Sequence, residues 1–115
     1  MPFRFRQEAH MKKGDAVVLI MKKMLFAGED LDEKKYACKV VQYDTKREVI
    51  FLELENDDLP AISLDAIYEC NIKEDNHLTV CTGRIGERYH NQHGKIIKLE
   101  INNGFYKINL KSVDK

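Results

Sequence analysis

The segment from Arg84 to Lys98 holds the residues of this chain whose types and spacing best suit ligand binding. Arg84 and Arg88 form an RxxxR spacing, and two arginines so placed could grip one phosphate group through paired N–H donors. Tyr89 follows directly and offers a ring on which a base could stack. The alternative is a solvated, ion-paired segment, because Glu87 stands between the arginines and surface pairs of this kind are common. The candidate ligand-binding residues are Arg84, Arg88, Tyr89, His93, Lys95 and Lys98.

His90 and His93 are the close histidine pair of the sequence and could in principle bind a metal. A protein zinc site needs a third and usually a fourth ligand of similar type. His77 and Cys81 have suitable side chains, but no known ligand spacing links them to the pair. We therefore expect a polar, solvent-facing segment and no metal site.

Catalytic patterns are missing from the sequence. Ser63, Ser112 and the cysteines lack a neighbouring base pattern such as GxSxG, and no glycine-rich loop opens a helix for nucleotide phosphates. Pairs of carboxylates, such as Asp57 with Asp58, lie in charged turns where solvation accounts for them. We expect a protein that is not an enzyme and that holds no cofactor.

The three cysteines and the N-terminal residues indicate the compartment. Cys38, Cys70 and Cys81 are an odd set without CxxC spacing, and they lie within strand-like runs. A free cysteine in a cytosolic protein is usually a small buried hydrophobe. The first ten residues include no apolar stretch of the secretory type. We therefore expect structural thiols and a cytoplasmic location.

The charge balance removes the general electrostatic argument for binding nucleic acid or acidic membranes. Lys and Arg together number 19, as do Asp and Glu, so the formal net charge is zero. Any basic surface must therefore be local. The longest apolar run, from Ala16 to Met21, is far shorter than the roughly 20 residues that span a bilayer, so no membrane span is expected.

Alternating apolar and polar residues predict that short β-strands position these side chains. The strongest hairpin pattern is Asn102-Asn-Gly104, which lies between the alternating runs 95–101 and 105–110. Residues 48–55 place Ile50, Leu52 and Leu54 on one face, as in a sheet packed on one side. Asp44 can lead a turn by accepting bonds from the backbone that follows. Further strands are predicted over residues 15–20, 34–43, 65–73 and 77–85, and a loop over 87–94.

Two glycines indicate how these strands close. Gly83 and Gly86 flank the end of the fifth predicted strand, where a bulge or bend lets a short sheet curl into a barrel. No amphipathic helix pattern is present. We expect an all-β fold, a small antiparallel barrel of six to seven strands. At 115 residues one domain fits, with residues 1–12 as a flexible N-terminal arm and residues 13–115 as the barrel.

Three segments carry a resemblance to a known family. They are Gly14-Asp-Ala-Val-Val-Leu19, Leu59-Pro60, and Thr82-Gly-Arg-Ile-Gly-Glu-Arg88, which leads into the last strands. Together they resemble the PilZN-type domain, the N-terminal barrel of YcgR-like flagellar brake proteins. The resemblance implies a non-catalytic bacterial split barrel that docks proteins or modulates a neighbouring domain. In that family a separate C-terminal PilZ domain binds cyclic di-GMP, and 115 residues leave no room for it.

The PilZ nucleotide site itself combines RxxxR with a [D/N]xSxxG motif. Arg84 and Arg88 match the first element. Asn91-Gln-His-Gly94 and Asn102-Asn-Gly104 both lack the serine and the spacing of the second. The resemblance therefore implies a place in cyclic di-GMP-linked signalling without binding of the nucleotide by this chain.

Three functional hypotheses remain. The first is a PilZN-like adaptor or regulatory domain that acts through protein–protein contacts or self-association. The second is a barrel that binds a nucleotide or single-stranded nucleic acid through the loop containing Arg84 and Arg88, with affinity that falls steeply as salt rises. The third, an enzyme or cofactor carrier, rests only on analogy with other split barrels, some of which hold flavin.

Overall fold

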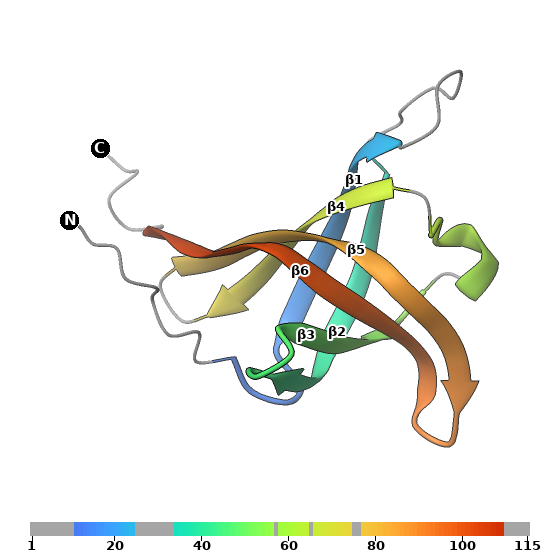
Figure 1. Ribbon diagram of the computed structural model, residues 1–115. Helices are drawn as coiled ribbons and strands as arrows, with labels where there is room; N and C mark the ends of the chain where they lie inside the picture. Colours follow the sequence, from blue (N-terminus) through green and yellow to red (C-terminus); the bar gives the residue numbers. More distant parts are fainter. Residues whose placement is uncertain (1–10, 25–33, 57, 65, 75–76, 110–115) are drawn as a thin grey trace.

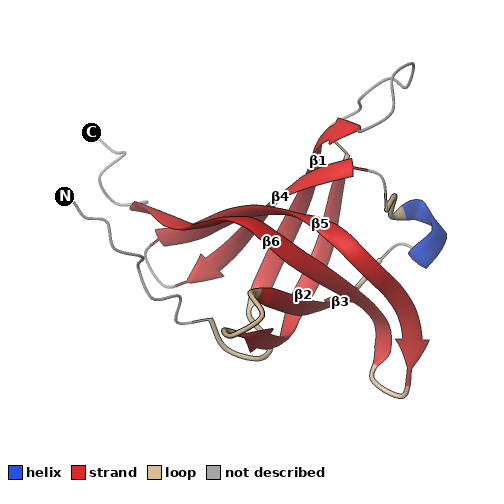
Figure 2. Cartoon of the chain, in the orientation of Figure 1, coloured by secondary structure: helices blue, strands red, loops and turns tan. Residues whose placement is uncertain are grey.

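Six antiparallel strands close into a barrel in the computed structural model (Figure 1). The structure describes residues 11–24, 34–56, 58–64, 66–74 and 77–109. Within these residues the only helical element is η1, a single 3₁₀ turn (Figure 2). The predicted all-β antiparallel barrel is confirmed. The elements are β1 (Ala16–Met24), β2 (Lys35–Asp44), β3 (Val49–Leu54), η1 (Leu59–Ala61), β4 (Ala66–Glu74), β5 (His77–Asn91) and β6 (Gly94–Asn109).

The strand order around the barrel is β1-β2-β3-β6-β5-β4, and β4 pairs with β1 to close it. The chain therefore forms two three-stranded meanders, β1 to β3 and β4 to β6, which meet through the β3–β6 and β1–β4 pairs. The segment that carries η1 connects the two meanders. Closure gives each strand a neighbour on both sides over part of its length, and so limits free sheet edges.

Alternate residues of every strand point into the barrel and form its core. This period of two is the one that the sequence pattern predicts. Ile62, from the segment between η1 and β4, is fully buried and joins the same core. The described residues contain no helix of the length and apolarity that a membrane crossing requires. The core residues are Val17, Leu19, Tyr36, Cys38, Val40, Ile50, Leu52, Leu54, Ile62, Ala66, Tyr68, Cys70, Ile72, Cys81, Ile85, Ile97 and Leu99.

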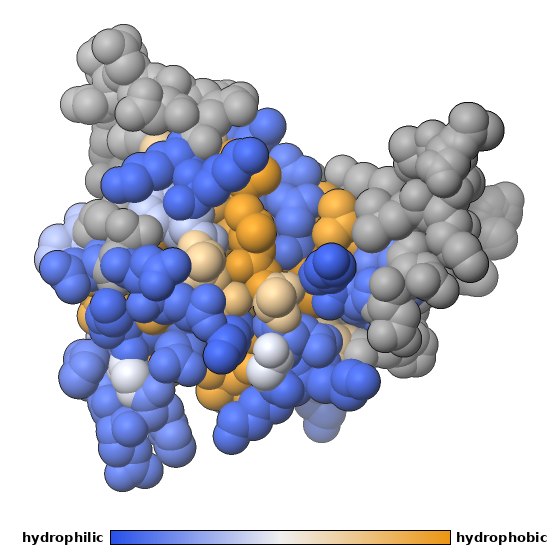
Figure 3. All heavy atoms as spheres, turned by 180° about the vertical axis from the view of Figure 1, so that it is seen from behind, coloured by the Kyte–Doolittle hydropathy of each residue, from blue (hydrophilic) through white to orange (hydrophobic). Residues whose placement is uncertain are grey.

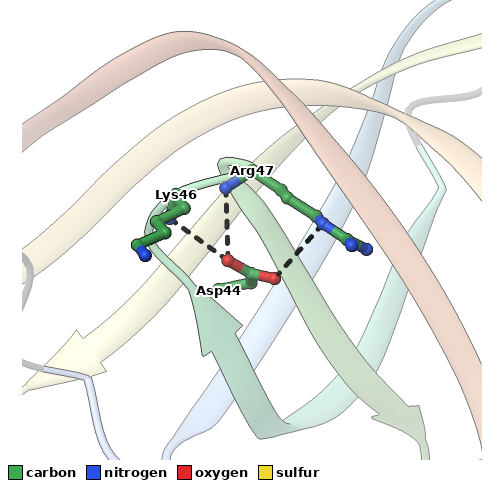
Figure 4. Close-up of polar contacts among 3 residues, drawn as sticks. All are labelled: Asp44, Lys46 and Arg47. Carbon is green, nitrogen blue, oxygen red and sulfur yellow. Dashed lines mark hydrogen bonds and ion pairs between the residues drawn. The ribbon is translucent and has the colours of Figure 1, made fainter.

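The predicted turn led by Asp44 is confirmed (Figure 4). The Oδ1 atom of Asp44 accepts hydrogen bonds from the backbone N–H groups of Lys46 and Arg47, at 3.1 and 3.2 Å. The Arg47 Nε atom lies 3.9 Å from the second carboxylate oxygen. Glu48 completes the turn with a positive φ of 57°. One carboxylate thus satisfies the backbone that reverses the chain between β2 and β3.

The predicted hairpin at Asn102-Asn-Gly104 is wrong. These residues lie inside β6, a continuous strand that pairs with β5 on both sides of them, from Tyr106 with Val80 to Ile101 with Gly83. A two-residue hairpin turn of the primed type needs positive φ at its central residues. Among the described residues only Gly14, Glu48 and Gly94 have positive φ. The Asn-Gly step is instead absorbed as an irregularity in the register with β5.

The loop predicted over residues 87–94 is also wrong in extent. β5 continues to Asn91 and β6 begins at Gly94, so the chain reverses through Gln92 and His93 alone. Asn91 Oδ1 accepts a hydrogen bond from the His93 N–H at 2.8 Å, and Gly94 takes a φ of +117°. The local turn chemistry, Asn followed three residues later by Gly, therefore forms the hairpin here and not at the later Asn-Gly step.

The bulges predicted at Gly83 and Gly86 are confirmed. The register between β5 and β6 shifts between Thr82 and Gly83 and again between Ile85 and Glu87. At Gly83 an added Cβ would collide with the backbone carbonyl of Glu100. The predicted N-terminal arm lies outside the described residues except for residues 11 and 12. Of these, Met11 packs against the core.

Candidate functional site

The last hairpin extends beyond the barrel. β5 pairs with β4 only from His77 to Arg84, and β6 pairs with β3 only from Ile96 to Glu100. Within the described residues, residues 86–91 of β5 therefore have only β6 as a strand neighbour, and residues 94 and 95 of β6 have only β5. We call residues 86–95 the β5–β6 arm. Figure 1 shows the arm leaving the barrel as a curved two-stranded ribbon. All six candidate ligand-binding residues lie in this arm or within three residues of it.

The bulge at Gly86 sends Arg84 and Arg88 to opposite faces of β5. Residues four apart in a regular strand share a face. Here Gly86 is an extra residue, because Ile85 pairs with Leu99 and Glu87 pairs with the next β6 residue, Lys98. Residues that lie directly opposite each other share a face. Arg84 lies opposite exposed Glu100, whereas Arg88 lies opposite buried Ile97, so the two guanidinium groups do not converge on one phosphate.

Arg88 anchors the segment between η1 and β4. It is half-buried, and its Nη1 atom donates a hydrogen bond to the backbone carbonyl of Ile62. The hydroxyl of Tyr68 donates to the carbonyl of Ser63 and accepts from the N–H of the same residue, both at 2.9 Å. Two side chains thus satisfy consecutive backbone groups of a segment that has no strand partner. Arg88 therefore has a structural role whether or not it binds a ligand.

The environment of Tyr68 keeps its hydroxyl protonated. Burial raises the pKa of Tyr68 to about 12, and the nearby Tyr36 acts in the same direction. The hydrogen bond from Ser63 and the positive charge of Arg88 oppose this rise in pKa only in part. The neutral hydroxyl can therefore act as both donor and acceptor at Ser63 throughout the physiological range.

The other four candidate residues are divided between the faces and the tip of the arm. Lys95 is on the inner face, where its Nζ atom lies 3.8 Å from Asp58 Oδ1 near η1. Tyr89 and Lys98 are on the outer face with Arg84, and His93 is in the exposed turn. The structure thus brings the candidates together on one hairpin but does not gather them around one pocket.

Acidic side chains alternate with the basic ones on the outer face. Lys98 lies opposite Glu87, and Arg84 lies opposite Glu100. Such cross-strand pairing of opposite charges stabilises the sheet and lowers the local positive potential. Tyr89 stands apart from these pairs, with 36% of its surface exposed. The outer face is therefore a mixed-charge surface with one exposed aromatic ring.

The cysteines lie in the interior, away from the arm. Cys70 and Cys81 are direct cross-strand partners in the β4–β5 pair, and Cys38 is buried in the same core. The hydrogen bond with the Cys81 side chain, together with burial, raises the pKa of Cys70 well above its ordinary value. Protonated, buried thiols are poor nucleophiles. The prediction that these cysteines are buried is confirmed.

The histidines are dispersed. His93 is in the turn of the arm and His90 is exposed on its inner face, whereas His77 lies at the other end of β5, 3.4 Å from Glu74. Among the residues that the structure describes, no group of three His, Cys, Asp or Glu side chains is placed to hold a metal ion.

A second surface feature lies on the opposite side of the barrel. Viewed from behind, the molecule shows a narrow apolar strip within a polar surface, where β1 crosses the barrel (Figure 3). Val18 of β1 is 40% exposed. Val18 and Tyr89 are the two exposed large hydrophobic residues of the described chain.

Sequence reasoning missed two features of this region. One is the clamp of Arg88 and Tyr68 on the segment after η1, which depends on contacts between residues 5 and 26 positions apart. The other is the unpaired strand edge of the arm. The position of Gly94 after Asn91 was the available sign of an early turn, and hence of long strands on either side.

Comparison with known proteins gives no match to a protein family, a curated protein or a solved structure.

Proposed function

We propose that this chain is a non-catalytic adaptor or regulatory domain that acts through protein–protein contacts made by the β5–β6 arm. The observation that carries the proposal is the projection of the arm beyond a barrel whose interior is packed with apolar side chains. Such an interior is a core and not a binding chamber. The part of the molecule that remains free for recognition is the surface, and among the described residues the arm projects from it.

From the resemblance to the PilZN-type domain we further propose a role in bacterial cyclic di-GMP-linked signalling. A closed six-stranded antiparallel barrel is compatible with that resemblance. The domain would act in the cytoplasm on a partner that carries or senses the nucleotide. The separation of Arg84 and Arg88 by the Gly86 bulge supports a role in which this chain does not bind cyclic di-GMP itself.

Affinity capture with the full chain tests the proposal. The bait is compared with a Tyr89→Glu variant, which changes the outer face of the arm, and with a Val18→Glu variant, which changes the exposed strip on β1. Both positions are exposed, so both variants should fold. We expect partner proteins that the wild-type and Val18→Glu baits retain and that the Tyr89→Glu bait loses. Capture that does not depend on the arm would contradict the proposal.

The nucleic-acid and nucleotide hypothesis is tested separately. Labelled cyclic di-GMP and a labelled single-stranded oligonucleotide are titrated against the chain at low and moderate salt. Phosphate contacts release counterions, so binding by the basic residues of the arm should weaken steeply with salt. Tight binding that Arg84→Ala abolishes would favour this hypothesis over the adaptor. We expect no binding to either probe at low salt.

A further inference from the structure

The β5 edge of the arm is an unpaired strand edge within the part of the chain that the structure describes. β5 has β4 beside it only as far as Arg84, and no backbone hydrogen bond joins residues 87–91 to another segment of the described chain apart from β6. Four of these five residues are exposed, the exception being Arg88, whose side chain turns inward to Ile62. A strand edge with free N–H and C=O groups is a template for pairing with a further strand.

The free edge has natural limits at both ends. The bulge at Gly86 interrupts the regular strand on one side, and the turn at Gln92 ends it on the other. The regular part consists of residues 87–91, about 17 Å long at the usual rise per residue. Its central residue is Tyr89, which is also the exposed aromatic residue of the arm.

A second copy of the chain can pair with this edge symmetrically. When two identical strands pair antiparallel, a twofold axis relates them, and one residue of the strand lies opposite its own copy at that axis. Residues that lie opposite each other across the pair have their side chains on the same face of the sheet. An axis at Glu87 or at Arg88 would place like charges opposite each other. An axis at Tyr89 pairs the two tyrosines, sets Glu87 against Asn91 on the outer face and Arg88 against His90 on the inner face.

We propose that two copies of this chain associate edge to edge through residues 87–91 of β5, with Tyr89 on the twofold axis. The inference rests on the proposed function and names its partner. Pairing with a second copy gives hydrogen-bond partners to the free β5 edges of both chains. The axis at Tyr89 includes all of residues 87–91 in the pairing and places no like charges opposite each other. Because five residues bury a small area, the dimer is expected to be weak and dependent on protein concentration.

A charge-swap experiment tests the position of the axis. Tyr89→Glu and Tyr89→Lys each place like charges opposite each other and should be monomeric by light scattering at concentrations where the wild-type chain dimerises. An equal mixture of the two variants places Glu opposite Lys and should restore the dimer. Val18→Glu, on the exposed strip of β1, should dimerise like the wild-type chain.

A cross-linking experiment tests the register. Glu87→Cys and Asn91→Cys are opposite each other in the proposed pair, so a mixture of the two variants should form a covalent dimer under a mild oxidant. Each variant alone should not. The native cysteines are buried and give a common background.

A wild-type chain that stays monomeric at the highest soluble concentration, or a dimer that Tyr89→Glu leaves intact, would overturn the self-pairing. A monomer that still captures partner proteins through Tyr89 would overturn the self-pairing and leave the proposed function standing. A dimer that depends on Tyr89, together with partner capture that does not depend on the arm, would support the self-pairing and overturn the proposed function.

Discussion

Tyr68 joins the barrel core to the segment between η1 and β4. Its hydroxyl is the partner of both backbone groups of Ser63. Tyr68→Phe keeps the ring in the core but leaves that N–H and C=O without this partner. We expect the free energy of unfolding to fall by about 1–3 kcal/mol, measured by urea denaturation. The matched control is Tyr89→Phe at an exposed ring, which should change it by less than about 0.5 kcal/mol.

The same hydroxyl makes stability depend on pH in the alkaline range. The pKa of Tyr68 is about 12 in the folded chain, against an ordinary value of 10.0. Between these values the unfolded chain releases a proton that the folded chain keeps, so the stabilisation from Tyr68 is complete below pH 10.0 and is lost as the pH rises towards 12. The stability gap between the wild-type chain and Tyr68→Phe should therefore narrow from neutral pH to about pH 11. An unchanged gap would contradict the raised pKa.

The two arginines of the RxxxR spacing should behave differently because, among the residues that the structure describes, the Arg88 side chain bonds a backbone carbonyl and the Arg84 side chain does not. Arg88→Met removes the donor to the Ile62 carbonyl and should lower the free energy of unfolding by about 1 kcal/mol, discounted for partial exposure. Arg84→Met, at the exposed position, should change it by less than about 0.5 kcal/mol. Equal effects in chemical denaturation would show that the two side chains do not differ in their contacts.

At this scale the sequence predicted residue types well and residue partners poorly. The Asp44 turn is local and was predicted with its hydrogen-bonding role. The burial of the cysteines follows from their place in alternating strands. The orientation of Arg88 could not be predicted, because it depends on one extra residue at Gly86 and on an acceptor, Ile62, in another part of the chain.

The glycines of β5 and β6 determine the path of the last hairpin. At Gly83 an added Cβ would meet the rigid backbone of Glu100, whereas at Gly86 it would meet only the flexible end of the Glu100 side chain. Gly83→Ala should therefore cost about 2 kcal/mol or more, and Gly86→Ala less than about 1 kcal/mol.

Gly104 is the matched control for these substitutions. No atom of the described residues lies within 4 Å of a Cβ added at Gly104, and Gly104 has no positive φ. Gly104→Ala should be neutral or should stabilise the chain by up to about 0.5 kcal/mol. Thermal or urea unfolding of the three variants gives the ranking. A cost at Gly104 comparable to that at Gly83 would contradict the observed path of β6.

The misplaced hairpin shows where element-scale prediction fails. Asn102-Asn-Gly104 has the better local turn sequence, yet a reversal there would remove the partner of residues 77–82 of β5. Pairing along two long strands outweighs a local preference of this size. The strand periodicity predicted part of each of the six strands but divided β6 into two, 95–101 and 105–110. The choice between two turn sites depends on which neighbour strand is available.

The closed barrel should protect its interior thiols as one unit. Cys38, Cys70 and Cys81 come from three different strands and are all buried. Labelling by a thiol reagent is followed by mass spectrometry at a series of urea concentrations. We expect the three cysteines to give the same free energy of opening, equal to the free energy of global unfolding. Fast labelling of one cysteine, independent of urea, would show that its strand opens separately.

The order of strands in the barrel has a further consequence for the chain as a whole. β1, β2 and β3 occupy positions equivalent to those of β4, β5 and β6, so a twofold rotation across the barrel exchanges the two meanders in topology. Each three-stranded meander has two edge strands that pair with edge strands of the other meander, β1 with β4 and β3 with β6. A single connecting segment joins the two meanders in one polypeptide. The barrel thus has the topology of two similar halves joined covalently. Fragments 1–56 and 57–115, produced separately, should reassemble on mixing without that covalent link.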